Sequence, residues 1–277
     1  MTTAGTMRGP MGPHTDGGTG VAKLAVRDLV KLRRSGAGAV TTAVDRVSFD
    51  VRRGEFVCLL GPSGCGKTTI LNILAGLDRP DGGTVTLDGE PIAGPGPDRA
   101  VLFQEPALFP WLSVGGNVRL ALRLVGVPEA EQGGQAAWWL EAVGLGGHRD
   151  DRPHELSAGM RQRAALARAL ATDPDVLLCD EPFGALDAQA RELLQDELQR
   201  MWVQSEGSKT LVFVTHNVRE AALLADRVLV MSASPGRLVE EQRIVAPRPR
   251  RLDDALVAHV VTEIHELLMS EVETGRS

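Results

Sequence analysis

The stretch GPSGCGKTT at residues 61–69 constrains the fold of this chain more than any other feature. It holds three glycines within six residues and lies between two apolar runs, EFVCLL at 55–60 and ILNILAGL at 70–77. Glycine destabilises regular helices and strands. We therefore expect a tight turn between a strand and a helix, with a ligand that comes very close to its backbone.

Gly61, Gly66, Lys67 and Thr68 fit G-x-x-x-x-G-K-[ST], the phosphate-binding P-loop. Its glycines let successive backbone N–H groups turn toward an anion, and the helix that begins near Lys67 adds its dipole. We expect Lys67, in a loop rather than in the core, to reach the β and γ phosphates of a nucleotide, and Thr68 to bind Mg²⁺. The alternative is a glycine-rich turn with a chance lysine, but the strand before and the helix after are the context that the motif requires. The expected nucleotide-binding residues are Gly61, Pro62, Ser63, Gly64, Cys65, Gly66, Lys67, Thr68 and Thr69.

Apolar runs and helical patterns alternate along much of the chain. Strands are expected at 55–60, 100–104, 175–180 and 210–216, and helices at 68–77, 157–173 and 187–204. This alternation predicts an α/β fold with a parallel sheet and helices on both faces. Two regions differ from this alternation. The first has strands at 23–29 and 43–51, joined by a flexible turn over 33–42, and a hairpin at 83–92. The second is a helical insertion at about 107–170.

Composition excludes some classes of protein. The chain has 277 residues, 43% of them apolar, and no run reaches the roughly 18 to 20 apolar residues of a membrane span. A formal net charge of -6 argues against a nucleic-acid partner. Three cysteines without pairing or metal spacing suit a reducing compartment, and Cys65 is expected to be incidental rather than a nucleophile. We expect a protein that is soluble by itself.

Polar residues follow several predicted strands. Asp180 and Glu181 end the run VLLCDE, His216 ends TLVFVTH, and Gln104 ends AVLFQ. Open α/β sheets bind ligands at the carboxyl ends of their strands. We expect Asp180 to hold the Mg²⁺ shell, Glu181 to orient or deprotonate a water, and Gln104 to touch metal or water. A solvated acidic pair, a core-edge histidine and a surface-turn glutamine are the alternatives.

LSAGMRQR places Ser157, Ala158 and Gly159 ahead of a helix start. Ser157 is a suitable N-cap, and Pro174 lies just beyond the helix end. An ordinary capped helix explains Ser157 but not the Ala-Gly pair. We expect a second anion-binding site there, made by Ser157 and Gly159.

The two ends of the chain have different compositions. Residues 1–21 are rich in Gly, Thr and Pro and are expected to be disordered. Residues 246–277 read as a stiff basic linker, APRPRR, followed by an amphipathic helix with a stripe at Leu256, Val260, Ile264 and Leu267 or Leu268. We expect this helix to pack on its own domain rather than on a partner.

In this order and spacing, the P-loop, Gln104, the signature at 156–160, Asp180-Glu181, the GALD turn at 184–187 and His216 resemble the ATP-binding cassette (ABC) ATPase family. The resemblance covers nearly all of residues 22–245. The segments at 102–118 and 230–250 resemble the ATPase subunits of nitrate, sulfonate and taurine importers.

The resemblance implies a RecA-like P-loop NTPase core with an antiparallel β-subdomain and a helical insertion. It implies that Lys67, Gln104, Glu181 and His216 are catalytic, and that Thr68, Gln104 and Asp180 hold Mg²⁺. Two copies would sandwich two ATP molecules, each P-loop facing the partner's signature. The chain would lie at the cytoplasmic face of the membrane, bound to permease subunits and served by an extracytoplasmic solute-binding protein.

Two features depart from the family pattern, the signature and the adenine-stacking position. The signature reads LSAGM rather than LSGGQ, so Met160 replaces a polar side chain, and Arg33 stands near the position of an adenine-stacking ring. The alternatives to an import ATPase are a soluble ABC ATPase not coupled to transport and a plain P-loop nucleotide-binding module. LFPWLSV, directly after Gln104, is expected to contact the permease through Phe109, Trp111 or Leu112, with Trp111 as local core the alternative.

Overall fold

A six-stranded sheet forms the centre of the computed structural model, which describes residues 22–34, 39–184, 186–204 and 209–274. Its strands lie in the order β10 (Leu238–Arg243), β9 (Arg227–Met231), β3 (Phe56–Leu60), β8 (Thr210–Thr215), β7 (Val176–Asp180) and β6 (Arg99–Leu102). All neighbours pair in parallel except β10, which is antiparallel to β9. The predicted parallel sheet is confirmed, whereas β9 and β10 have no counterpart among the predicted strands.

The central strand β3 is buried along its whole length, and its side chains alternate between the two faces of the sheet. Phe56, Cys58 and Leu60 join a core with the helices α5 (Ala188–Gln204), α6 (Val218–Leu224) and α7 (Ala255–Thr274). Val57 and Leu59 join a second core with α1 (Lys67–Leu74) and the antiparallel sheet. This burial on both faces explains the continuous apolar run in the sequence.

A second, antiparallel sheet contains β2 (Val40–Arg52), β1 (Ala22–Arg34), β4 (Gly82–Leu87) and β5 (Glu90–Pro91), in that order. The flexible turn predicted over 33–42 is wrong in extent, because Arg33 pairs with Thr41 inside the ladder. The β-branched residues from Val40 onward favour a strand over a turn. The tip at 35–38 lies outside the described residues.

One lysine ties the two sheets together. Lys23 of β1 is 1% exposed, and its ammonium lies 2.5 Å from Asp88, in the turn between β4 and β5, and 2.8 Å from Asp175, just before β7. A buried ammonium is stable only when paired. The pair with Asp175 fixes the antiparallel sheet against the start of β7 in the central sheet.

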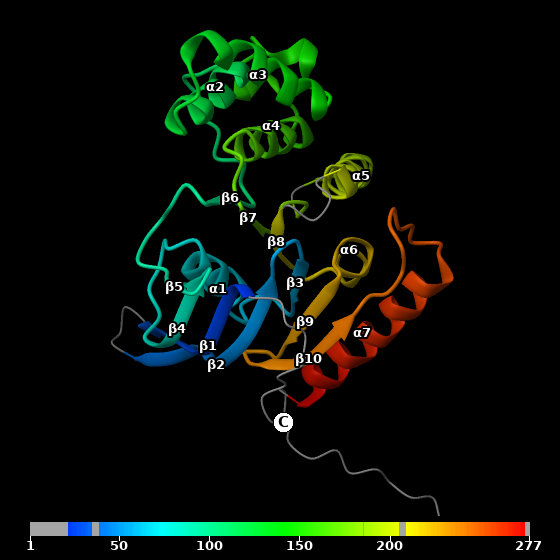
Figure 1. Cartoon of the computed structure of the whole chain (residues 1–277). Helices are drawn as coiled ribbons and strands as arrows, with labels where there is room; N and C mark the ends of the chain where they lie inside the picture. The colour runs from blue at the N-terminus through cyan, green and yellow to red at the C-terminus, as the bar shows by residue number, and fades with distance from the viewer. Residues whose placement is uncertain (1–21, 35–38, 185, 205–208, 275–277) are drawn as a thin grey trace, which may run out of the picture.

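Three helices follow β6 and form a separate lobe at the top of Figure 1, namely α2 (Val114–Leu124), α3 (Glu129–Ala142) and α4 (Ala158–Leu170). The lobe has its own apolar cluster, which includes Val118, Leu140 and Ala164. Two short 3₁₀ turns, Gly146–His148 and Pro153–Glu155, link α3 to α4. The helical character predicted for this insertion is confirmed, since α2, α3 and α4 all lie within about 107–170. The boundaries at 107–170 and 22–245 stay predictions.

The C-terminal helix α7 runs beside α6 and packs on its own chain, as expected (Figure 1). Its buried stripe consists of Val257, Val260 and Ile264. The prediction that Leu256 belongs to this stripe is wrong, because its side chain is 52% exposed and the neighbouring Val257 is buried instead.

The basic segment before α7 is a structural anchor, which corrects the prediction of a stiff basic linker. Arg250 is 4% exposed, and Arg248 pairs with Asp226 at 2.6 Å. The guanidinium of Arg248 also lies 5.4 Å from the ring centre of Phe56 and 5.8 Å from that of Trp202. Guanidinium groups stack on aromatic faces, so the arginine-rich segment before α7 can be buried.

No helix among the described residues is long and apolar enough to cross a membrane. The predicted disordered tail, residues 1–21, lies outside the described residues.

Candidate functional site

The predicted P-loop connects β3 to α1 at the carboxyl edge of the central sheet. Gly64 and Gly66 have φ values of 82° and 100°, a region that favours glycine. A Cβ added at Gly66 would lie 2.8 Å from Cγ2 of Val44 and 3.0 Å from the carbonyl oxygen of Ala43. Only glycine therefore lets the loop pass this close to β2 and begin α1.

Lys67 is buried, and its side chain lies against the P-loop. It is the first residue of α1 and only 4% exposed, so its predicted position in a loop away from the core is wrong. Its ammonium donates hydrogen bonds to the carbonyl oxygens of Gly61 at 2.8 Å and Pro62 at 2.9 Å. The positive charge is held within the loop that the sequence predicts to bind phosphate.

Thr68 and Asp180 meet where α1 and β7 face each other. The Thr68 hydroxyl donates a hydrogen bond to Oδ1 of Asp180 at 2.9 Å. Burial raises the pKa of the Asp180 carboxyl, and the Glu181 charge adds to this, whereas the Thr68 hydrogen bond and the Lys67 charge oppose it. A cation at this edge would favour the ionised carboxyl.

Glu181 and His216 meet at the ends of the neighbouring strands β7 and β8. Nδ1 of His216 lies 2.9 Å from Oε2 of Glu181. Glu181 has a φ of 42°, an unusual conformation for a residue with a side chain. A Cβ added at Gly184 would lie 3.3 Å from Nε2 of Gln104 and 3.9 Å from Oε2 of Glu181, so the Gln104 amide lies on the same side of the site.

Ser157 and Gly159 lie elsewhere, at the start of α4 in the upper lobe of Figure 1. Ser157 is the N-cap of α4, as predicted, and its hydroxyl accepts a hydrogen bond from the backbone N–H of Met160 at 3.2 Å. Within one chain, the fold thus gathers the P-loop, Asp180, Glu181, His216 and Gln104, but not the predicted second anion site.

Three polar residues behind His216 were missed from the sequence. Thr215, Asn217 and Glu220 form hydrogen bonds with one another on the side of the site nearest α6. No sequence motif extends beyond His216, and Glu220 reads as an ordinary polar residue of a helix. Its buried position depends on the packing of α6, which no local pattern reveals.

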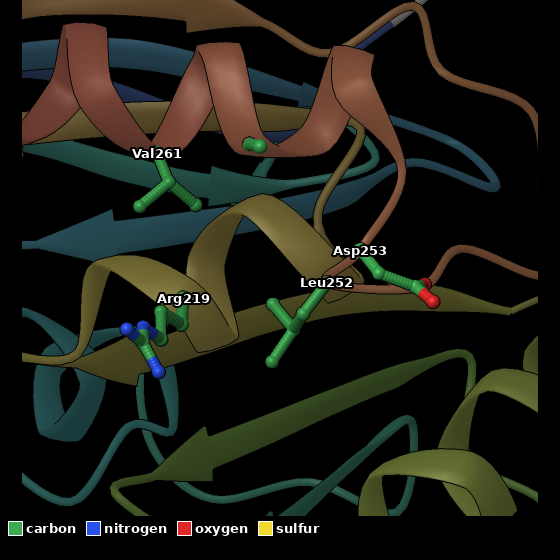
Figure 2. Close-up of a pocket in the computed structure, with 5 residues that line it drawn as sticks. Arg219, Leu252, Asp253 and Val261 are labelled. Carbon is green, nitrogen blue, oxygen red and sulfur yellow. The ribbon is translucent and has the colours of Figure 1, made fainter.

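A pocket of about 390 Å³ lies between α6 and α7, outside the predicted site. Figure 2 shows Arg219 of α6, Val261 of α7, and Leu252 and Asp253 from the segment before α7. None of the sequence-predicted site residues lines this pocket.

The oxygens of Thr68 and Asp180 suit Mg²⁺. This ion binds proteins through one or two oxygen ligands and completes its shell with phosphates and water. Among the described residues there is no group of three or more His, Cys, Asp or Glu side chains that could hold a metal by themselves. A hydroxyl beside one carboxyl group fits a magnesium ion that arrives with a nucleotide.

The fold and this edge of the sheet define a P-loop NTPase, and the comparison with known families agrees. The model of the family described as "ABC transporter" matches residues 44–184. The chain belongs to this family and is an ATPase that binds and hydrolyses ATP.

Particular relatives are similar over most of their length. A taurine import ATP-binding protein of Mesorhizobium japonicum is 52% identical over 202 residues, which cover 73% of this chain and 78% of the relative. An uncharacterised ABC transporter ATP-binding protein of Methanocaldococcus jannaschii is 48% identical over 228 residues, 82% of this chain and 84% of the relative.

Solved structures share the fold. A dimeric ATP-binding cassette in a post-hydrolysis state, bound to ADP and Pi, superposes with a TM-score of 0.72 and 30% sequence identity. The alignment covers 81% of this chain and 100% of that chain. These likenesses confirm the predicted RecA-like fold class and the predicted family.

Proposed function

We propose that this chain is the ATP-hydrolysing subunit of an ABC importer for a small anionic solute of the nitrate, sulfonate or taurine type. Separate permease subunits would carry the solute across the membrane, and an extracytoplasmic binding protein would deliver it. The chain would sit on the cytoplasmic face of the membrane. Support comes from the identity of 43% to 52% with taurine import ATP-binding proteins of several bacteria.

One observation carries the catalytic part of this proposal. The Thr68–Asp180 and Glu181–His216 contacts, both 2.9 Å long, lie at the ends of neighbouring strands beside the P-loop. Phosphoryl transfer needs phosphate binding, charge stabilisation and a positioned water at one place. The P-loop would bind phosphate, Thr68 and Asp180 would hold the Mg²⁺ that stabilises charge, and Glu181 would position the water.

In the proposed mechanism, the P-loop backbone and the Lys67 ammonium bind the β and γ phosphates, after Lys67 leaves the carbonyl oxygens of Gly61 and Pro62. Mg²⁺, held by Thr68, Asp180 and Gln104, would neutralise phosphate charge when bound. Glu181 orients or deprotonates the attacking water, and His216 faces the γ-phosphate while contacting Glu181.

A second copy would complete each site. Ser157 and Gly159 would bind the γ-phosphate held by the partner's P-loop, in a two-fold arrangement that makes two sites at once. Two features support this: Ser157 is exposed at a helix start while the P-loop of its own chain lies elsewhere, and the solved relatives include cassette dimers.

The test is the purified complex of this chain with its permease and binding protein. We expect nitrate, a sulfonate or taurine to raise its ATPase rate, because an importer couples hydrolysis to the solute. A rate that no such solute changes would contradict the solute class. A chain that associates with no permease would favour a soluble ABC ATPase instead.

A further inference from the structure

The turn that carries His216 is closed by a buried side chain. The backbone N–H of Asn217 donates to Oγ1 of Thr215 at 3.0 Å, so His216 lies inside a short loop between them. Thr215 is 2% exposed and is the last residue of β8. Turns closed by a threonine hydroxyl are weak by themselves. The backbone of His216 therefore depends on what holds that hydroxyl in place.

Glu220 holds it. The Thr215 hydroxyl donates to Oε2 of Glu220 at 2.6 Å, in a buried contact. A hydroxyl has one hydrogen, so giving it to Glu220 while accepting the N–H of Asn217 fixes the direction of both bonds. Burial raises the pKa of the Glu220 carboxyl, and the hydrogen bond from Thr215 and the charge of Arg191 oppose that rise.

Arg191 connects Glu220 to the turn that follows Glu181. Its Nε lies 3.8 Å from Oε1 of Glu220, and its Nη2 donates to the carbonyl oxygen of Leu186 at 3.0 Å. Leu186 belongs to the GALD turn at 184–187. A chain of polar contacts therefore runs from that turn, through α5 and α6, to the loop that carries His216.

We propose that Glu220, acting through Thr215, is a positioning residue that holds the His216 imidazole against Glu181, and that Arg191 ties this arrangement to the backbone at Leu186. The consequence for ATP hydrolysis rests on the proposed function. The positioning itself does not, because it concerns the geometry of the fold. These contacts connect Leu186, which follows β7, to the loop of His216, which follows β8.

The experiment observes the imidazole directly. In protein with isotope-labelled histidine, the ring signals of the six histidines are recorded, and that of His216 is assigned by its loss in His216→Gln. We expect Thr215→Val and Glu220→Ala to shift the His216 signal and leave the others in place. Thr215→Ser keeps the hydroxyl and should leave the signal unmoved.

A matched control removes a largely buried ion pair elsewhere. Glu55 pairs with Arg227 at 2.8 Å, and Glu55→Ala should lower stability without shifting the His216 signal. Should the buried substitutions unfold the chain, Arg191→Gln breaks the outer end of the link at a side chain that is 35% exposed, and the same shift is expected. An unmoved His216 signal in the folded variants would overturn the proposal.

The ATPase rate separates this inference from the proposed function. We expect Thr215→Val and Glu220→Ala to lower kcat about 10-fold to 100-fold, as misplacement of a catalytic group does, with ATP affinity unchanged within about twofold. A shifted ring signal with an unchanged rate would leave the positioning intact and contradict the catalytic role of His216.

Discussion

At the scale of single residues, Lys67 has both a structural and a proposed catalytic role. Its ammonium donates to the carbonyl oxygens of Gly61 and Pro62. We expect Lys67→Ala to weaken ATP binding at least about tenfold, or about 1.4 kcal/mol, because a charge leaves the phosphate site. Unfolding free energy should fall by about 1–2 kcal/mol, since two acceptors lose their donor.

Calorimetric titration with ATP and urea unfolding of the same samples measure the two effects. Wild-type ATP affinity in Lys67→Ala would contradict the assignment of Lys67 to the phosphate site. Lys209→Ala is a suitable control, because it also removes a lysine ammonium that has a bonding partner, here Asp173, but Lys209 lies just before β8, away from the P-loop.

The ionised Asp180 carboxylate is expected to serve ATP hydrolysis but to lower the free energy of unfolding. Its pKa is raised above the ordinary value of 3.8, chiefly by burial, so the folded chain binds a proton more tightly there than the unfolded chain does. Wild-type stability therefore falls as pH rises through that raised pKa and stays lower above it. Asp180→Asn does not ionise, so its stability does not fall in this way, and its amide oxygen can still accept the hydrogen bond from the Thr68 hydroxyl.

We expect Asp180→Asn to lose ATP hydrolysis and to gain unfolding free energy at neutral pH. Urea unfolding at about pH 7 and about pH 4 checks this, because the gain should shrink where the wild-type carboxyl is protonated. A variant less stable than wild type at pH 7 would show that the ionised carboxylate stabilises the fold instead.

The sequence predicts the P-loop residues of this site but not Glu220 and Arg191, for a physical reason. The P-loop is local: its glycines, lysine and threonine contact one another within nine residues, so their spacing is enough. The contact between Glu220 and Arg191 joins two helices across the fold. Such pairs depend on tertiary packing, and no periodicity in either helix predicts them.

At the scale of elements, the segment after Gln104 presents an aromatic surface. Trp111 is 68% exposed, so the reading of this residue as local core is wrong, and its ring lies 5.3 Å from that of Phe109. Exposed aromatic groups are typical of interfaces. We expect Trp111→Ala to impair assembly with the permease or transport, while ATP binding by the isolated chain stays unchanged.

Trp138 offers the matched control for this prediction. It lies on α3 and is 62% exposed, so Trp138→Ala removes the same side chain from the same lobe without touching the segment after Gln104. Co-purification with the permease and ATP titration of each variant supply the measurements. Equal losses for both tryptophans would argue against a specific contact at Trp111.

Most helices and strands of the core are predictable, because burial on two faces leaves long apolar runs such as 55–60 and 210–215. The segment 246–251 is not, since its arginines read as solvent-exposed until Phe56, Trp202 and Asp226 are placed beside Arg248. Likewise, the helical period of α7 is evident, but whether Leu256 or Val257 faces α6 depends on how the helix is rotated.

At the scale of the whole molecule, the separation of the P-loop from α4 predicts ATP-dependent pairing. Glu181→Gln keeps the shape of the side chain and removes its basic carboxylate. We expect its hydrolysis rate to fall about 10²-fold or more, and we expect the protein to form a stable dimer with ATP that reverts with ADP. Light scattering with and without each nucleotide measures the mass. A dimer that forms equally without nucleotide would refute ATP as the adhesive.

Ser157→Asp in the Glu181→Gln protein tests which surface faces the partner. Asp is as good an N-cap as Ser, so α4 should stay intact while a negative charge meets the partner's γ-phosphate and prevents dimers. Ser113→Asp makes the same change at the N-cap of α2 and should leave the dimer unaffected. Gly159→Glu is less suitable, because a Cβ at Gly159 would lie 2.8 Å from that of Ala190 in the same chain. Persistent dimers in Ser157→Asp would contradict the proposed role of Ser157.

Arg250 has a consequence for how the chain is made. Its buried guanidinium, whose pKa burial lowers to about 10, remains charged and donates to the carbonyl oxygens of Ala222, Ala225, Ile244 and Ala246. Until it is in place, the end of α6 and the segment after β10 lack the donor for these acceptors. During synthesis on the ribosome, β3 and the P-loop emerge early, but the core packed against β3 includes Val257, so it is complete only after this late arginine has been translated. A nascent chain stopped before residue 250 should therefore remain sensitive to protease.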